Sequence, residues 1–200
     1  MPKIVDHESR RIEVAEAVWT VVQRDGINAA SVRAVAAECG WTYGMIAHYF
    51  KNRDDLLLFA YRLALTRELE RAPTAKEQPD PVERLVGLLV RALPIDKDAS
   101  LDLRIWLGFM GRVADDPSLA KAVLGEHSHY HSAVLDHVHE CFEAARVSTP
   151  LPAETLTRQI TVYVDGLGIA ATLDPDTYSA DTLESTLRMF LQAMGFDCAT

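Results

Sequence analysis

The residues best suited to binding chemistry lie in one short segment, SVRAVAAECGWTYGMIAHYFKNRDDLL, at positions 31–57. Two short helical patterns flank Gly40, and small or apolar residues recur on one side of both. Arg33 stands at the start of the first pattern, while Lys51 and Arg53 follow the second. Guanidinium and ammonium groups bind phosphate oxygens, and arginine also donates to the guanine edge in the major groove. The spacing therefore predicts a unit that binds nucleic acid.

The outward face of the second helical pattern carries almost no charge. Such a face suits insertion into the major groove of DNA, where base edges offer acceptors and methyl groups. Three helices with a glycine-centred turn between the second and third are the outline of a helix-turn-helix unit. A helical hairpin that only packs is the alternative, because an alanine four residues before a glycine is common by chance. The residues predicted to contact DNA are Ser31, Arg33, Thr42, Tyr43, Gly44, Met45, Ala47, His48, Tyr49, Lys51 and Arg53.

Helical periodicity runs through the rest of the chain and predicts an all-α fold of about nine helices. Glycine at 26 and 40 and proline-containing segments further on separate the helices. We divide the chain into a DNA-binding domain over residues 1–53 and an effector-binding and dimerisation domain over residues 54–200. The expected helices span 8–25, 31–38, 42–49, about 51–71, 81–93, 97–114, 117–146, 152–173 and 179–195.

Residues 8–58 resemble the tetracycline-repressor (TetR) family of bacterial transcription regulators. The segment at 31–57 is similar to that family's helix-turn-helix and to its YF-x-x-K-x-x-L entry into the fourth helix, matched here by Tyr49, Phe50, Arg53 and Leu56. Two positions depart from the family pattern: Ala47 replaces an aromatic residue, and Arg53 replaces lysine. The resemblance implies DNA binding, with the phosphate-binding charge retained at position 53.

The C-terminal two-thirds resembles the choline-regulator-like (BetI-type) subgroup, on RIWLGFMGRVADDPSLAKAV (104–123) and YVDGLGIAATLDPDTYSADTLESTLRMFL (163–191). This resemblance implies a helical body that binds a small-molecule effector and a dimer interface made by the last two helices. Packing of the same apolar stripes within one chain is the alternative to a dimer. The predicted interface residues are Leu156, Ile160, Tyr163, Leu167, Leu183, Leu187, Phe190, Leu191 and Met194.

Aromatic and histidine side chains on the sixth and seventh expected helices predict an effector cavity. Its expected lining is Trp106, Phe109, Met110, His127, Tyr130 and His131. The two histidines are spaced i, i+4 and could share a metal ion, but neighbouring turns supply no third ligand, so we predict no metal site. Core packing of the same residues is the remaining interpretation.

Asp165 interrupts an apolar helical face, and a buried carboxylate needs a partner. Arg104 and Arg112 on the sixth expected helix are the candidates, so an ion pair is the first expectation. Contact with a ligand is the second.

Charge and composition narrow the class of protein. The net charge is −9, but residues 1–53 carry +1 and the rest carries −10, which fits a polyanion-binding head on an acidic body. No apolar run approaches the roughly 18 residues of a membrane span, and MPKIVDHESRR lacks the apolar stretch of a secretory signal. Three widely spaced cysteines form no disulfide framework. We therefore expect a reduced, cytoplasmic protein.

No phosphate loop, nucleophile elbow or metalloprotease motif occurs in the sequence, so we expect neither an enzyme nor a cofactor. An enzyme built on the histidines and an interaction protein with a vestigial DNA unit are the alternatives. The sequence predicts a ligand-responsive homodimer that binds a palindromic double-stranded DNA operator and is released by an unidentified small-molecule effector. Repression is the expected outcome, and activation is the alternative.

Overall fold

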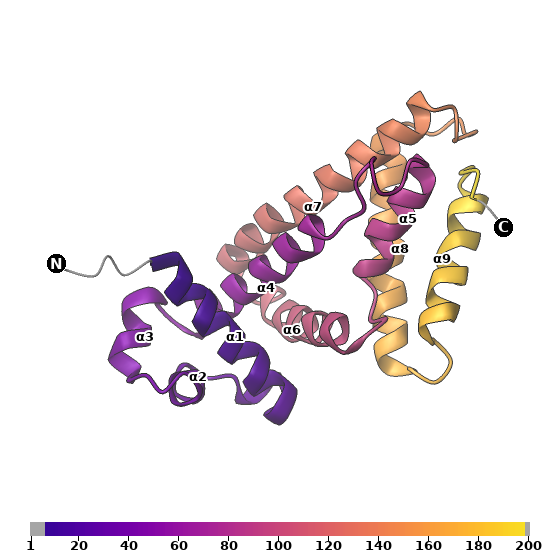
Figure 1. The fold of residues 1–200 in the computed structure, drawn as a ribbon. Coiled ribbons are helices and arrows are strands. Elements are labelled where there is room, and N and C mark those ends of the chain that lie inside the picture. The colour runs from indigo at the N-terminus through magenta and orange to yellow at the C-terminus, as the bar shows by residue number, and fades with distance from the viewer. Residues whose placement is uncertain (1–6, 199–200) are drawn as a thin grey trace. The chain divides into compact units, whose positions relative to one another are not determined.

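The computed structural model describes residues 7–198, and helices make up most of this part of the chain (Figure 1). Extended pairing among these residues is limited to one bridge between Val147 and Phe196. None of the described helices is both long and apolar enough to cross a membrane. The predicted all-α fold of about nine helices is confirmed. In chain order the elements are α1 (His7–Asp25), the 3-10 turn η1 (Ile27–Ala29), α2 (Val32–Glu38), α3 (Tyr43–Tyr49), α4 (Arg53–Glu70), α5 (Pro81–Arg91), α6 (Lys97–Val113), α7 (Pro117–Glu143), α8 (Ala153–Leu173) and α9 (Ala180–Ala193).

Polar side chains fix the starts of the helices on either side of the glycine turn. The Ser31 hydroxyl accepts a hydrogen bond from the Ala34 amide at 3.2 Å, and the Thr42 hydroxyl accepts one from the Met45 amide at 3.3 Å. Gly40 between them has a φ of 68°, in the left-handed region that glycine enters without steric penalty. This conformation ends α2 and turns the chain into α3.

The end of α7 differs from the prediction. The helix ends at Glu143 instead of continuing to position 146. Ala145 has a φ of 54°, and the Arg146 amide donates to the Cys141 carbonyl at 2.9 Å. This hydrogen bond closes the helix in the way that a C-terminal glycine usually does. The sequence pattern misses it because alanine is the strongest helix former.

The described chain forms two compact units. The first unit contains the residues up to 66 together with 104–124, and the second contains 67–103 together with 125–198. Helices α4, α6 and α7 therefore each contribute residues to both units. The predicted division after residue 53 concerns function and remains a prediction.

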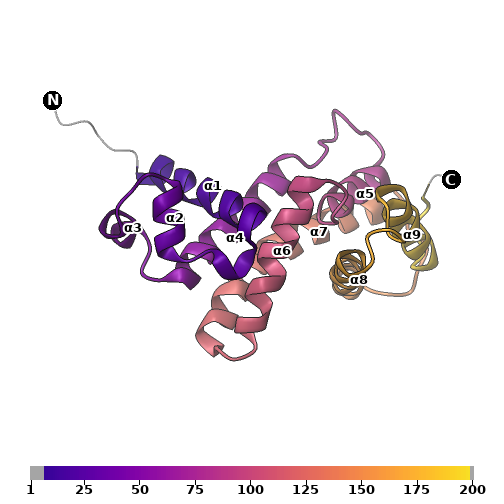
Figure 2. The same ribbon diagram turned by 90° about the horizontal axis from the view of Figure 1, so that it is seen from below.

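The core of the first unit is built by α1, α2, α3 and the start of α4, of which Figure 2 shows the first three grouped together. Each of these helices turns an apolar face inward, as its periodicity predicts. The fully buried members include Val14, Val18, Val35, Ile46, Phe50, Leu56 and Leu57. This packing leaves the opposite face of α3 exposed.

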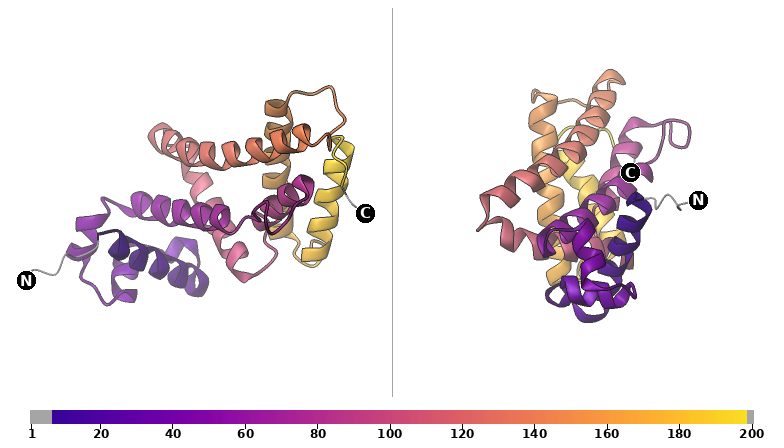
Figure 3. Two further views of the ribbon diagram at one scale, coloured as in Figure 1. Left: turned by 45° about the horizontal axis from the view of Figure 1, so that its top comes forward. Right: turned by 90° about the vertical axis from the view of Figure 1, so that its left-hand side faces the viewer.

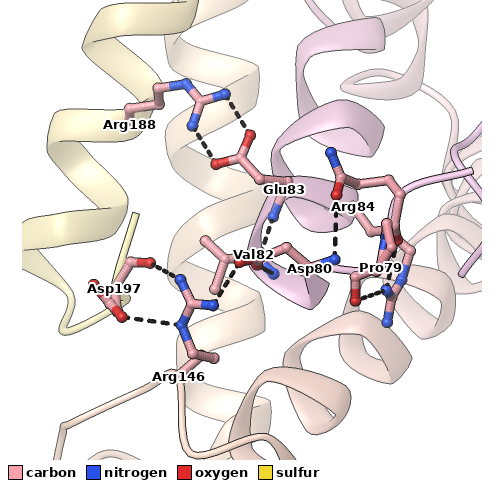
Figure 4. A network of polar contacts seen from close by, with 9 residues as sticks. Pro79, Asp80, Val82, Glu83, Arg84, Arg146, Arg188 and Asp197 are labelled. Carbon is pink, nitrogen blue, oxygen red and sulfur yellow. Dashed lines mark hydrogen bonds and ion pairs between the residues drawn. The ribbon is translucent and has the colours of Figure 1, made fainter. Parts of the chain in front are cut away.

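The core of the second unit is rich in leucine and is shared by α5, α7, α8 and α9. In this unit α8 and α9 run side by side (Figure 3). Ion pairs hold the start of α5 to its surroundings (Figure 4). Arg188 of α9 donates two hydrogen bonds to Glu83, each 2.7 Å long, and Arg146 pairs with both Asp80 and Asp197. These contacts fix the first turn of α5 against α9 and the segment after α7.

Candidate nucleic-acid interface and effector site

The residues predicted to contact DNA from the outward face of α3 and from its cap are all exposed. They are Thr42, Tyr43, Gly44, Met45, Ala47 and His48. Tyr43 and Met45 are the large apolar members, and Tyr43 is 56% exposed. Ile46, on the opposite side, is fully buried and anchors the helix. Exposed apolar side chains of this size at a helix start are suited to contacts with base edges and thymine methyl groups. Their contact with DNA remains a prediction.

Arg33 and Lys51 present free cationic groups beside α3. Both side chains are exposed, and neither forms a hydrogen bond or ion pair with a described residue. The Lys51 amide, in contrast, donates to Asp55 Oδ2 at 3.0 Å, and the Asp55 amide donates to Asn52 Oδ1 at 2.8 Å. These bonds occupy the amides of Lys51 and Asp55, whereas the side chains of Arg33 and Lys51 remain to bind a phosphate.

Arg53 has a structural function that the sequence did not indicate. Its Nε donates to the Ala30 carbonyl at 2.9 Å, and its Nη2 donates to the Ile27 carbonyl at 2.6 Å. Burial and the neighbouring charge of Arg112 lower the pKa of the guanidinium. Arg53 thus ties α4 to η1 and to the start of α2. Its predicted phosphate contact is left to the N–H groups of Nη1 and Nη2 that these two bonds do not use.

An aromatic cluster supports α3 from the side of α1. The Tyr49 ring lies 5.8 Å from Trp41, 5.2 Å from His7 and 5.2 Å from His48, measured between ring centroids. The Arg10 guanidinium lies over the Trp41 ring at 5.3 Å, within the range of a cation–π interaction. Tyr49 is half-buried in this cluster, so it positions α3. His7 and Arg10 were not predicted, because nothing in the sequence indicated that the start of α1 lies beside α3.

The residues predicted to line an effector cavity fall into both units. Trp106 and Met110 belong to the first unit, whereas His127, Tyr130 and His131 belong to the second, and the Phe109 side chain lies outside the described part. Burial lowers the pKa of His127. No group of three metal-ligating residues occurs among the described residues.

Tyr130 is buried, at 8% exposure, and its hydroxyl has no hydrogen-bond partner among the described residues. Asp165 on α8 is half-buried, and Arg104 and Arg112, its predicted partners, belong to the first unit, so that ion pair stays a prediction. Arg112 bonds to Asp54 at 2.6 Å within the first unit, and Asp165 forms no ion pair or hydrogen bond with another described residue of the second unit. Burial raises the pKa of Asp165 to about 6. Among its described residues the second unit thus holds a carboxylate and a phenol that have no partner within that unit.

The stripes predicted to form a dimer interface lie mostly inside the protomer. Leu156, Ile160, Leu167, Leu183, Leu187 and Leu191 are buried in the core of the second unit, which is the intramolecular packing that the sequence left open. An open apolar groove of about 480 Å³ lies outside this core, lined by Arg158, Gln159, Val162, Tyr163, Phe190 and Met194. The Tyr163 and Phe190 rings in it are stacked 3.8 Å apart. Three of the nine predicted residues thus reach the surface at this groove.

Two family models match the chain. The model described as "BetI-type transcriptional repressor, C-terminal" covers residues 81–195, and the one described as "Bacterial regulatory proteins, tetR family" covers residues 15–59. The HTH-type transcriptional regulator PksA of Bacillus subtilis (strain 168) is 26% identical over 195 residues, which are 97% of this chain and 94% of that protein. The regulator BetI of Vibrio atlanticus is 25% identical over 198 residues, 96% of this chain and 94% of that protein.

Solved structures share the fold. A transcriptional regulator from Rhodococcus sp. Rha1 has a TM-score of 0.79 and 26% identity, and the match covers 95% of this chain and 99% of that chain. A regulator from Saccharomonospora viridis, solved in complex with choline, has a TM-score of 0.76 and 21% identity, covering 96% of this chain and 100% of that one.

Proposed function

Since the chain belongs to the TetR family of DNA-binding transcription regulators and carries a BetI-type C-terminal domain, we propose that it is a homodimeric repressor. In this proposal the dimer binds a palindromic operator and is released from it by a small molecule. The observation that supports DNA reading most directly is the uncharged, exposed face of α3 beside the unpaired Arg33 and Lys51. Such a protein acts in the cytoplasm, where bacterial DNA lies.

Operator reading requires two copies of α3. In this proposal each copy lies in one major groove, and the two grooves are about 34–36 Å apart, one helical turn of DNA. Tyr43 and Met45 contact base edges, Arg33 reaches a guanine edge or a phosphate, and Lys51 binds a phosphate.

The test is a fluorescence-anisotropy titration of the full chain with DNA from upstream of its own gene, followed by selection from random DNA. The expected result is saturable binding to a palindrome at two chains per site, with affinity that falls as salt rises. A transcription assay on the selected operator then distinguishes repression from activation. Failure to enrich any sequence from random DNA would contradict the proposal.

Two substitutions separate base reading from phosphate binding. Lys51→Ala is expected to weaken binding to operator and random DNA alike. It should also lower the salt slope, the steepness with which log affinity falls with log salt concentration, by about 1 per chain. Arg33→Ala is expected to weaken operator binding by about 1–3 kcal/mol if it reads a guanine, with a smaller effect on random DNA. Titrations at several salt concentrations measure both effects. Lys76→Ala, which removes an exposed cation from the loop before α5, is the control, and an unchanged slope in Lys51→Ala would exclude its phosphate contact.

The effector response requires a connection to the DNA-binding helices, and α6 supplies one within the first unit. Arg112 of α6 bonds to Asp54 at the start of α4. A Cβ atom added at Gly108 of α6 would lie 2.5 Å from Ile27 Cγ1 in η1, so only glycine fits there without displacement. In this proposal a shift of α6 moves η1 and thereby α2 and α3.

Gly108→Ala is therefore expected to lower operator affinity more than tenfold and to destabilise the fold by about 1–3 kcal/mol, because the added methyl group displaces Ile27. Gly111→Ala, on the same helix, is the control: its Cβ meets nothing within 4 Å, so stability should rise by up to about 1 kcal/mol and affinity should not change. Urea unfolding and DNA titration measure the two quantities. Equal operator affinities for the two variants would exclude a role for the Gly108–Ile27 contact.

A further inference from the structure

Helix α3 has little of its own to hold it in place. It has seven residues, too few for a stable isolated helix in water. Among these seven Ile46 alone is buried, and the opposite face is left exposed for DNA. A helix fixed at one central point can still turn or tilt about that point. The orientation of α3 therefore depends on what holds its two ends.

Two adjacent arginines of α1 lie over the aromatic residues that flank α3. The Arg10 guanidinium lies 5.3 Å from the centre of the Trp41 ring, just before the cap at which α3 begins. The Arg11 guanidinium lies 5.3 Å from the centre of the ring of Phe50, the residue that caps the other end of α3. Both distances are within the range of about 6 Å for a cation–π interaction. Neighbouring side chains of one helix thus contact both ends of α3.

Arg11 is bound mainly by aromatic rings. Its guanidinium also lies 4.1 Å from the centre of the Phe59 ring on α4, and the Phe50 and Phe59 rings lie 5.5 Å apart. Its Nε is buried with no hydrogen-bond partner, and the side chain forms no ion pair with a described residue. A cation withdrawn from water needs compensation, and the two ring faces supply it among the described residues.

The same face of α1 contacts the last turn of α3. His7, Arg10 and Arg11 are spaced i, i+3 and i+4, which places them on one side of the helix. The His7 ring lies 5.2 Å from Tyr49 and 5.8 Å from His48, measured between ring centroids. The first turns of α1 therefore hold α3 through side chains that the DNA-facing surface of α3 does not use.

We propose that Arg10 and Arg11 are positioning residues for operator reading. Together they hold α3 at both ends in the orientation in which its exposed face enters the major groove. Only the words operator reading rest on the proposed function. The hold on α3 itself is a property of the free protein and is measured without DNA.

The first test is amide hydrogen exchange of the full chain without DNA. The double variant Arg10→Met/Arg11→Met keeps much of the side-chain volume but removes both cations. Exchange of the amides at 46–50 is expected to rise at least tenfold, because two cation–π interactions are lost. Exchange in α2, which has the same length, should change less than about twofold. Arg10→Lys/Arg11→Lys should restore part of the protection, because an ammonium group also interacts with a ring face.

A matched control lies on the same helix. Arg24→Met removes an arginine from the last turn of α1, together with its 2.8 Å ion pair to Glu38 of α2. This pair is exposed and lies away from the aromatic contacts with α3, so exchange in α3 should not change. Glu13→Gln removes the 2.7 Å ion pair of Arg10 while leaving its cation, and should also leave α3 as in the wild type.

The second test is a DNA titration at several salt concentrations. Arg10→Met/Arg11→Met is expected to lower operator affinity at least tenfold and affinity for random DNA less than about threefold, with an unchanged salt slope. This pattern follows when α3 is misaligned but no phosphate contact is lost. A direct phosphate contact would instead lower the slope by about 1 for each arginine and weaken binding to both DNAs, while α3 exchanged as in the wild type. That outcome would overturn the positioning role.

Three results of the exchange experiment would also overturn the proposal. They are unchanged exchange in α3, an equal rise in α2 and α3, and equal exchange in the methionine and lysine variants. The second would mean a general loss of stability, and the third would mean that the cations do not matter. If exchange in α3 rose as expected but the wild type enriched no sequence from random DNA, the hold on α3 would stand and the proposed function would fail.

Discussion

Replacing Arg53 with methionine is expected to lower the free energy of unfolding by about 2–3 kcal/mol and operator affinity by more than tenfold. The substitution keeps much of the side-chain volume but removes the donors to the Ile27 and Ala30 carbonyls. Hydrogen bonds from a charged donor each contribute about 1.5–3 kcal/mol, and the carbonyls lose part of this when water replaces the guanidinium. Without them η1 and the start of α2 are no longer fixed to α4. Urea unfolding and anisotropy titration measure the two effects.

Arg53→Lys distinguishes a positioning role from a direct phosphate contact. Lysine retains the charge but has no planar pair of donors to reach two carbonyls. A positioning role therefore predicts that Arg53→Lys recovers only part of both the stability and the affinity. A phosphate role predicts full recovery of affinity by lysine, and a lowered salt slope with unchanged stability in Arg53→Met. The second pattern would contradict the assignment made from the hydrogen bonds.

The structural features that the sequence predicted correctly are those determined by residues close to one another along the chain. The turn at Gly40 is a local feature and lies where the prediction placed it, and the caps Ser31 and Thr42 are the first residues of the two helices predicted on either side of it. The outward face of α3 follows from the same periodicity that buries Ile46. Family membership was predicted from this segment as well, and the comparisons confirmed it.

The sequence could not predict partners that are distant along the chain. Arg53 bonds to backbone carbonyls, which every residue possesses, so no residue type marks them. Arg104 and Arg112 were named as candidate partners of Asp165 because a buried carboxylate needs one, and the sequence did not indicate that Arg112 pairs with Asp54. A carboxylate without a partner among the described residues of its own unit, such as Asp165, looks the same in a sequence as a paired one. The unpaired state becomes visible only when the neighbours of the side chain are known.

The apolar stripes of α8 and α9 show the same limit in the packing. Periodicity identifies the apolar face of a helix but not the surface that covers it. The strongest stripe, with Leu156, Ile160 and Leu187, is covered by the protein's own core. The predicted interface residues outside this core, Tyr163, Phe190 and Met194, line the groove together with Val162, which is 66% exposed. Exposed apolar residues beside an apolar groove are typical of an interface between proteins.

Val162→Asp is therefore expected to convert a dimer into a monomer at micromolar concentration and to lower operator affinity at least 100-fold, while the protomer stays folded. The aspartate would place a charge in the apolar groove when a second copy covers it, but in the monomer it faces water. Affinity falls because two linked heads bind one operator with a high effective concentration, which a monomer lacks. Sedimentation velocity and anisotropy titration measure both quantities.

Two controls make this result specific to the groove. Leu124→Asp changes an apolar residue of similar exposure, 69%, on α7, and should alter neither dimerisation nor operator affinity. Leu187→Ala changes a fully buried residue of the predicted stripe and should lower the free energy of unfolding by about 2–5 kcal/mol through the cavity that it leaves. If Val162→Asp remained a dimer while Leu124→Asp became a monomer, the groove between α8 and α9 would not be the interface. If only Leu187→Ala became a monomer, dimerisation would depend on the stability of the core and not on the groove. The buried Leu187 side chain cannot contact a second copy of the chain.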